Sequence, residues 1–121
     1  MLAYKQLEEK ILPWVISVPS GNFVNICAGM LAHKMGMPCH KFIASTNVNK
    51  TVPNYLKTAS YSPAASLQTI SNAMDVGDPS NFSRILELYS SDHNEVKRDL
   101  EGYWFTDKQT REAIKELYER F

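Results

Sequence analysis

The sequence predicts an α/β fold in which helices flank a partly parallel sheet. Residues 14–18 (WVISV) form a short, β-branched apolar run that is typical of a buried strand. Residues 23–36 have the spacing of a packed helix, and residues 40–44 (HKFIA) have the pattern of a second strand. A strand, a helix and a strand within about 30 residues form a βαβ unit, which pairs its two strands in parallel.

The first half of the chain has a signal for each element. Residues 3–12 predict a helix, with apolar positions at Leu2, Leu7 and Ile11 and the charged residues Glu8, Glu9 and Lys10 between them. Pro19 ends the first strand. The helix over 23–36 places five apolar side chains on one face, and Gly36 followed by Pro38 ends it. Those five side chains are Phe23, Ile26, Cys27, Met30 and Leu31.

The middle of the chain predicts mostly loop. Residues 45–80 are rich in Pro, Gly, Ser, Thr and Asn, with a short helix expected at 52–58. Residues 81–90 predict a helix with Ser80 as its N-cap.

The last part of the chain predicts a charged helix near 92–101 and a short aromatic strand at 103–105. Thr106 followed by Gln109 matches a capping box that opens a last helix. We expect that helix to bury Ile114, Leu117, Tyr118 and Phe121.

Length and composition indicate one small domain. The chain has 121 residues, and its 44% hydrophobic content is ordinary for a globular protein. No apolar run approaches the roughly 20 residues needed to cross a bilayer, and the polar N-terminus does not match a signal peptide. Cys27 and Cys39 lie in apolar segments and do not form a disulfide framework. We therefore expect a cytoplasmic protein.

The formal net charge is zero, but the charges are unevenly distributed. Residues 1–60 carry six Lys and two Glu, whereas residues 61–121 carry seven Lys or Arg and eleven Asp or Glu. The basic half suits an anionic ligand, although an ordinary solvated surface explains the same charges. Nucleic acid is not an expected partner, because no basic stripe is interleaved with aromatic residues.

The junction between the first strand and its helix, Ser20–Asn25, is a candidate anion site. The first backbone N–H groups of a helix are unpaired and carry partial positive charge. A loop of small residues lets an anion approach them, and Ser20, Asn22 and Asn25 add side-chain donors. The alternative is an N-cap and turn that merely connect two packed elements, since a single glycine is weak support for a phosphate loop.

Several long strings of this sequence resemble the threonine synthases, the bacterial type in particular. They are VPSGNFVNICAG, LAHKMGMP, KFIASTNVN, TVPNYL and TISNAMDVGDPSNFSRILEL, and the likeness covers nearly the whole chain. The resemblance implies a pyridoxal 5′-phosphate enzyme of fold type II, the class of tryptophan synthase β. Family members convert O-phospho-L-homoserine and water into L-threonine and phosphate, in threonine biosynthesis.

The resemblance also implies which residues contact the cofactor. In the family this loop binds the phosphate group of pyridoxal 5′-phosphate. Carried over, the contacts are Ser20, Gly21, Asn22, Phe23, Val24 and Asn25.

One position of the loop departs from the family pattern. The family usually has Gly-Asn-Phe-Gly-Asn, whereas the fourth residue here is Val24. A glycine required for positive φ or close backbone approach would make valine costly. In a first helical turn valine would only narrow the pocket. We hypothesise that Val24→Gly tightens phosphate binding.

The lysine that holds the cofactor is a second departure. In the family it lies upstream in a Phe-Lys-Asp context, and none of the nine lysines here follows Phe and precedes Asp. A Pro-His segment expected after the last helix is also missing. We therefore expect residues 1–121 to be a single internal fragment of the large cofactor domain, inactive alone and prone to self-association through exposed core faces. The alternative is a non-catalytic, stand-alone phosphate-binding or interaction domain derived from such an enzyme.

No other group of residues indicates a catalytic or metal site. His33, His40 and His93 are scattered without ligand spacing. Asp75 and Asp78 are expected to form turns and to lie near a helix N-terminus rather than to act as paired carboxylates.

Overall fold

The computed structural model describes residues 13–121 and contains a parallel three-stranded sheet. Its strands lie in the order β1 (Val15–Pro19), β2 (Lys41–Thr46), β3 (Leu100–Trp104). Val15 pairs with Lys41, and Phe42 pairs with Leu100. The α/β class and the parallel βαβ unit expected from the sequence are confirmed. The helix expected at 3–12 lies outside the described residues.

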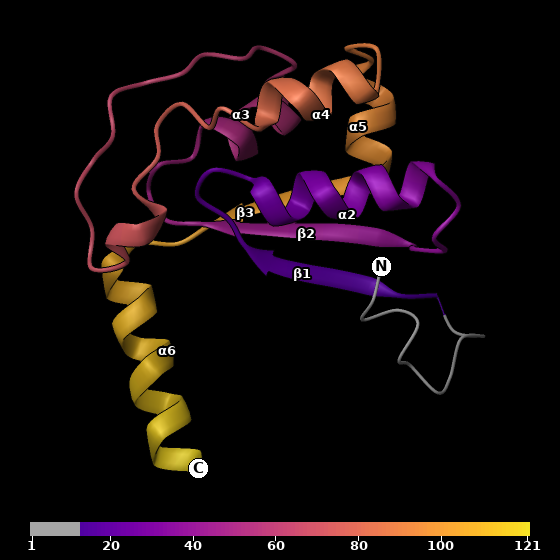
Figure 1. Ribbon diagram of the computed structural model, residues 1–121. Helices are drawn as coiled ribbons and strands as arrows, with labels where there is room; N and C mark the ends of the chain where they lie inside the picture. The colour runs from indigo at the N-terminus through magenta and orange to yellow at the C-terminus, as the bar shows by residue number, and fades with distance from the viewer. Residues whose placement is uncertain (1–12) are drawn as a thin grey trace.

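Four helices cover one face of this sheet (Figure 1). They are α2 (Val24–Lys34), α3 (Thr51–Thr58), α4 (Phe82–Leu88) and α5 (His93–Asp99). The segment between α3 and α4 is irregular, apart from the short 3-10 helix η1 (Asn72–Met74). Within residues 13–121, no helix combines the length and apolarity that a membrane crossing requires.

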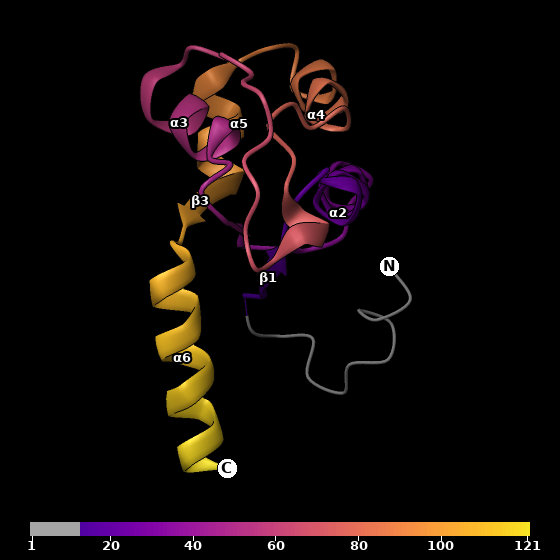
Figure 2. The same ribbon diagram turned by 90° about the vertical axis from the view of Figure 1, so that its left-hand side faces the viewer.

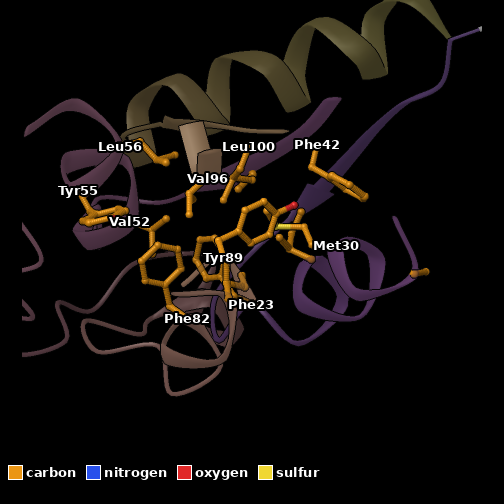
Figure 3. Close-up of a cluster of buried hydrophobic side chains, with 14 of the residues drawn as sticks. Phe23, Met30, Phe42, Val52, Tyr55, Leu56, Phe82, Tyr89, Val96 and Leu100 are labelled. Carbon is orange, nitrogen blue, oxygen red and sulfur yellow. The ribbon is translucent and has the colours of Figure 1, made fainter. Parts of the chain in front are cut away.

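The core lies between the sheet and this helical layer (Figure 3). Its fully buried side chains come from every element of the layer and from two strands: Ile26, Met30, Phe42, Val52, Phe82, Ile85, Tyr89, Val96 and Leu100. Burial of such side chains contributes roughly 1.5–3 kcal/mol each. The core therefore fixes the position of α2, and with it the loop that precedes α2.

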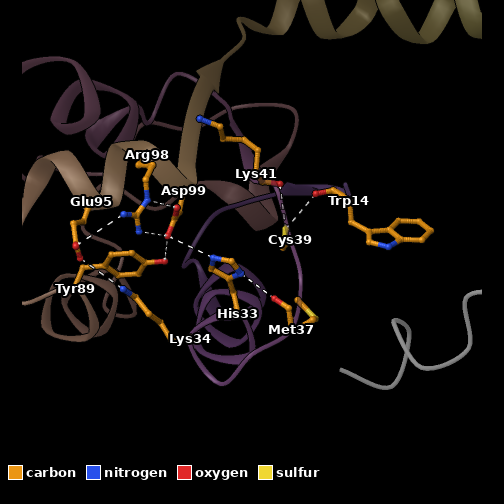
Figure 4. A network of polar contacts seen from close by, with 10 residues as sticks. All are labelled: Trp14, His33, Lys34, Met37, Cys39, Lys41, Tyr89, Glu95, Arg98 and Asp99. Atoms are coloured by element: carbon orange, nitrogen blue, oxygen red, sulfur yellow. Dashed lines mark hydrogen bonds and ion pairs between the residues drawn. The ribbon is translucent and has the colours of Figure 1, made fainter. Parts of the chain in front are cut away.

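A polar cluster around the buried carboxylate of Asp99 joins α5 to α2 (Figure 4). Asp99 accepts hydrogen bonds from Tyr89 Oη at 2.9 Å and from Arg98 Nε at 2.9 Å, and His33 Nε2 lies 3.7 Å from it. Burial alone would raise the pKa of Asp99, but the donated hydrogen bonds of Arg98 and Tyr89 outweigh it and lower the pKa. Asp99 is thus held as a carboxylate by partners from α5, from α2 and from Tyr89, the C-cap of α4.

Several boundaries differ from the sequence prediction. The strand expected at 103–105 begins earlier, at Leu100, because Leu100 is extended and fully buried against the core. The charged helix expected near 92–101 accordingly ends at Asp99. Ser80 does not cap α4: the N-cap is Asn81, and the Ser80 hydroxyl donates to Asn22 instead.

The prediction that the last helix buries four apolar residues is wrong. Helix α6 (Asp107–Arg120) begins at the predicted Thr106–Gln109 capping box, but it projects away from the other helices in both views (Figures 1 and 2). The exposed fractions of Ile114, Leu117, Tyr118 and Phe121 are 60%, 55%, 86% and 98%. Within the described chain nothing packs on this face, so its amphipathic pattern is left unpartnered.

Candidate functional site

The predicted anion loop lies at the carboxyl end of β1, between β1 and α2. Ser20 is its first residue and is buried. Its backbone N–H donates to the Ser45 carbonyl at 2.8 Å, which ties the loop to the end of β2. Its hydroxyl donates to the Val18 carbonyl at 2.9 Å. The hydroxyl proton of Ser20, which we expected to face an anion, is therefore donated to a backbone carbonyl of β1 in this structure.

Gly21 and Asn22 hold the loop against the stretch Ser71–Asn81. A Cβ on Gly21 would lie 2.9 Å from Met74 Cα, so only glycine fits this close approach of two backbones. Asn22 Oδ1 accepts a hydrogen bond from Ser80 Oγ at 3.0 Å. This stretch, which is part of the string TISNAMDVGDPSNFSRILEL, thus forms a wall beside the loop.

Phe23 has a left-handed backbone, with φ 62° and ψ 21°, and is the N-cap of α2. This conformation costs a non-glycine residue roughly 1–2 kcal/mol. The Phe23 ring is buried and packs edge-to-face on Phe82, with ring centroids 5.8 Å apart. Burial of the ring offsets the backbone strain and fixes where α2 begins.

Val24 is the first residue of α2, and its side chain is 56% exposed. The positive φ of the loop belongs to Phe23, so no positive φ is required of Val24. Of the two alternatives weighed from the sequence, valine in the first helical turn is the one observed. Val24 therefore adopts a helical backbone without strain, and it affects the loop only through the volume of its side chain.

The N-terminus of α2 presents unpaired donors to a small hollow. The N–H of Cys27 donates to the Phe23 carbonyl, but the N–H groups from Gly21 to Ile26 make no hydrogen bond to any residue of the described chain. The first turn of α2 carries no acidic side chain, so the positive end of the helix dipole is not neutralised there. The hollow has a volume of about 140 Å³ and is lined by residues 18–25. A water needs roughly 10–15 Å³ by the same measure, so an anion the size of phosphate fits.

A polar cluster at the end of β2 lies next to this wall. Asp75 accepts hydrogen bonds from Thr69 Oγ1 at 2.7 Å, from the Thr69 N–H at 3.0 Å and from Asn47 Nδ2 at 2.8 Å. The hydrogen bond from the Thr69 hydroxyl is the main cause that holds the pKa of Asp75 below its usual range. Burial opposes it, and the Thr69 N–H and Asn47 add to the lowering of the pKa. Asn49 extends the cluster by donating to the Leu67 carbonyl and accepting from the Leu67 N–H.

Gly77 closes the other end of the same wall. The Thr51 hydroxyl donates to the Gly77 carbonyl at 2.7 Å, and the Gly77 N–H donates to Ser66 Oγ at 3.0 Å. A Cβ on Gly77 would overlap the Ala64 carbonyl. The segment between α3 and α4 is therefore tied to β2, α3 and the loop, although it has little regular structure.

The structure brings all six predicted loop residues together, while the three histidines remain apart from them. His33 contacts Asp99, and His93 Nε2 lies 3.1 Å from the carbonyls of Tyr55 and Leu56. In the described part of the chain, no three His, Cys, Asp or Glu side chains are grouped as metal ligands. The sequence analysis missed the Asp75 cluster; its signal was the Asn-X-Asn that follows the second strand, whose partners lie 18 to 28 residues away.

Comparison with known proteins finds threonine synthases. The chain is 45% identical over 105 residues to threonine synthase of Escherichia coli strain K12, covering 87% of this chain and 24% of that protein. It is 43% identical over 103 residues to threonine synthase of Haemophilus influenzae, covering 85% of this chain and 24% of that protein. The chain thus spans about a quarter of the length of these relatives. No family model matches.

Solved threonine synthases share its fold. The crystal structure of the Escherichia coli enzyme superposes with a TM-score of 0.83 at 42% identity, over 95% of this chain and 27% of that one. A PLP-bound threonine synthase from Brucella melitensis superposes with a TM-score of 0.79 at 25% identity, over 90% of this chain and 29% of that one. The expected resemblance to threonine synthases is confirmed in both sequence and fold.

Proposed function

We propose that this chain is an internal part of a threonine synthase, and that its loop Ser20–Asn25 binds the phosphate group of pyridoxal 5′-phosphate. The observation that carries the proposal is the row of unpaired N–H groups from Gly21 to Asn25, whose residues line a hollow at the carboxyl end of β1. Open α/β sheets bind ligands at that edge. The chain that carries this loop is similar to a threonine synthase over 105 of its residues.

The residues present fit a phosphate group. The absence of a Cβ at Gly21 lets the loop pack directly against the backbone of Met74. No acidic side chain lines the hollow, and Asn22 and Asn25 carry amide groups that can donate to phosphate oxygens. The basic balance of residues 1–60 adds a weaker, long-range attraction for the anion.

In the parent enzyme the proposed reaction converts O-phospho-L-homoserine and water into L-threonine and phosphate, as a cytoplasmic step of threonine biosynthesis. Bound pyridoxal 5′-phosphate supplies the electron sink for such chemistry. This chain's contribution is positional: the buried core fixes α2, the wall Ser71–Asn81 fixes the loop, and the loop holds the phosphate. No lysine of this chain lies in the Phe-Lys-Asp context of the family, so we expect the chain alone to be inactive.

A second candidate function is a non-catalytic phosphate-binding or interaction domain derived from such an enzyme, and the missing lysine context favours it. The DNA that flanks the coding region separates the two. An open frame that continues in both directions, with Phe-Lys-Asp encoded upstream, supports the synthase. Stop codons close to both ends would overturn that assignment and leave the binding domain.

The phosphate loop is tested by titrating the full chain with pyridoxine 5′-phosphate, which lacks the aldehyde that would react with lysines. We expect NMR shifts concentrated at the amides of residues 21–26, and much weaker shifts with pyridoxine, which lacks the phosphate. Asn22→Asp keeps the Oδ1 acceptor for Ser80 but adds a negative charge at the hollow, so it should weaken binding. Asn94→Asp makes the same chemical change at an exposed position of α5 and should not weaken binding. Equal binding of both ligands, or equal effects of both variants, would contradict the proposal.

A further inference from the structure

Another hollow in the described part of the chain runs along the outer edge of β3. In the sheet order β1-β2-β3, strand β3 pairs only with β2 within the described chain. Its outer row of N–H and C=O groups therefore has no strand partner among residues 13–121. Figure 2 shows β3 at the side of the sheet, below α3 and α5. An exposed edge of this kind is a template for one more strand.

A groove of about 400 Å³ follows this edge. It is lined by every residue of β3, by one side of α3 and by Lys97 of α5. Gly102 allows α3 to approach closely, because a Cβ there would lie 3.0 Å from Leu56 Cδ1 and 3.2 Å from Pro53 Cα. A groove between an edge strand and a helix is the geometry in which extended peptides add to a sheet.

The groove carries uncompensated positive charge. Lys57 and Lys97 line it, and neither forms an ion pair within the described chain. Its one carboxylate, Glu101, is already bound by Lys41 Nζ at 3.3 Å and by Tyr103 Oη at 3.0 Å. The chain as a whole has no net charge, so the positive groove is a local feature.

Aromatic surface is available at the carboxyl end of the groove. Tyr103 is 48% exposed and Trp104 is 39% exposed. Lys50 Nζ lies 3.9 Å from the centroid of the Trp104 ring and adds a third positive charge there. Exposed aromatic rings beside lysines supply apolar contact and charge at the same place.

We propose that the groove between β3, α3 and α5 binds an extended acidic peptide, which adds to the sheet as a strand beside β3. Backbone hydrogen bonds to the outer edge of β3 hold the peptide, and its carboxylates lie near Lys57 and Lys97. A lysine-bearing edge also discourages pairing with other edges. That protective role disfavours any strand that would bury the lysines unpaired, whereas a binding groove selects acidic strands that pair with them. The inference does not depend on the phosphate loop.

The test uses the full chain and a labelled peptide of about seven residues that alternates Glu with Thr or Val, long enough to span β3 at 3.3 Å per residue. We expect saturable binding and slower hydrogen exchange at the β3 amides in the complex. A peptide in which Lys replaces each Glu should not bind. An acidic peptide N-methylated on one edge keeps its charge but loses backbone donors, so it should lose most of its affinity.

Charge-reversal variants complete the test. Lys57→Glu with Lys97→Glu should weaken binding of the acidic peptide by roughly tenfold or more. Arg84→Glu with Lys108→Glu makes the same net change on exposed α4 and α6 positions outside the groove, and should have little effect. Equal losses in the two double variants, or unchanged affinity of the N-methylated peptide, would overturn the proposal, because either would indicate diffuse electrostatic attraction. Far-UV circular dichroism establishes that both double variants are folded.

Discussion

The left-handed backbone conformation of the loop and the first residue of α2 fall on two different residues, Phe23 and Val24. Phe23 adopts the left-handed conformation and compensates by burying its ring against Phe82. Val24 begins the helix and leaves its side chain at the mouth of the hollow. Valine instead of glycine at position 24 therefore changes the space in the hollow and not the backbone conformation of the loop.

We expect Val24→Ala to strengthen the binding of pyridoxine 5′-phosphate, because the smaller side chain widens the hollow without loosening the helix start. Val24→Gly should gain less, since glycine in a helix costs about 0.5–1 kcal/mol relative to alanine. Calorimetric titration of the three proteins measures the order of affinities. Leu31→Ala, at an exposed position of α2 outside the hollow, is the matched control. Binding that weakens on removal of the valine side chain would show that Val24 contacts the ligand favourably.

At the scale of elements, the segment between α3 and α4 is irregular in backbone but closely tied to its surroundings. Asp75 fastens it to the end of β2 through Asn47, and Gly77 fastens it to α3 through Thr51. These hydrogen bonds substitute for the ladder that a strand or helix would provide. The wall beside the phosphate loop therefore depends on a few side chains, and Asp75 receives the most donors among them.

The stability of this wall should depend on pH through Asp75. Its lowered pKa means that the carboxylate stabilises the fold above the pKa of the unfolded chain, about 4, and that this contribution is lost as the pH falls through the lower folded pKa. Asp75→Asn should therefore be less stable than the parent near neutral pH, and the difference should shrink below a pH of about 4. Urea unfolding across this range measures the difference, and faster exchange of the Thr69 amide reports the local loss.

Asp78→Asn is the control for Asp75, because its carboxylate accepts a single hydrogen bond, from Tyr61 Oη, within the described residues. We expect a smaller change than for Asp75→Asn. A difference between Asp75→Asn and the parent that grows toward acid would contradict the assignment, since it would require a carboxyl group that is stabilised in its protonated form.

The sequence predicts the βαβ unit, the loop position and the Thr106–Gln109 cap, because each depends on residues close together in the chain. Resemblance identified the six loop residues, and the structure places them on one hollow. The Asp75 cluster could not be predicted, since its partners Asn47 and Asn49 are remote in sequence. Their pairing depends on how an irregular segment folds back. The start of β3 was misplaced for a similar reason: burial of Leu100, not its local pattern, makes that residue extended.

At the scale of the whole molecule, one side of the sheet carries the helical layer and the opposite side is open. Val15, Ser17 and Pro19 of β1 point to the open side and are exposed, as is Tyr103 of β3. Helix α6 projects beyond this side and exposes its own apolar stripe of Ile114, Leu117, Tyr118 and Phe121 (Figure 2). Exposed apolar surface on this scale marks an interaction face.

This exposed stripe leads us to expect that the 121-residue chain in solution associates with itself. Sedimentation velocity over a wide concentration range should show an average mass that rises above the 13.8 kDa of the monomer. Ile114→Ser with Leu117→Ser removes apolar surface from the centre of the stripe without changing charge, and should shift the rise to higher concentration. Leu31→Ser with Met35→Ser removes comparable exposed surface from α2 and its C-cap and serves as the control. If both pairs of substitutions acted equally, association would follow total apolar exposure. If only the α6 pair acted, the stripe itself would be the contact. A segment that covered the stripe in a longer protein would then be expected to compete for the same four side chains.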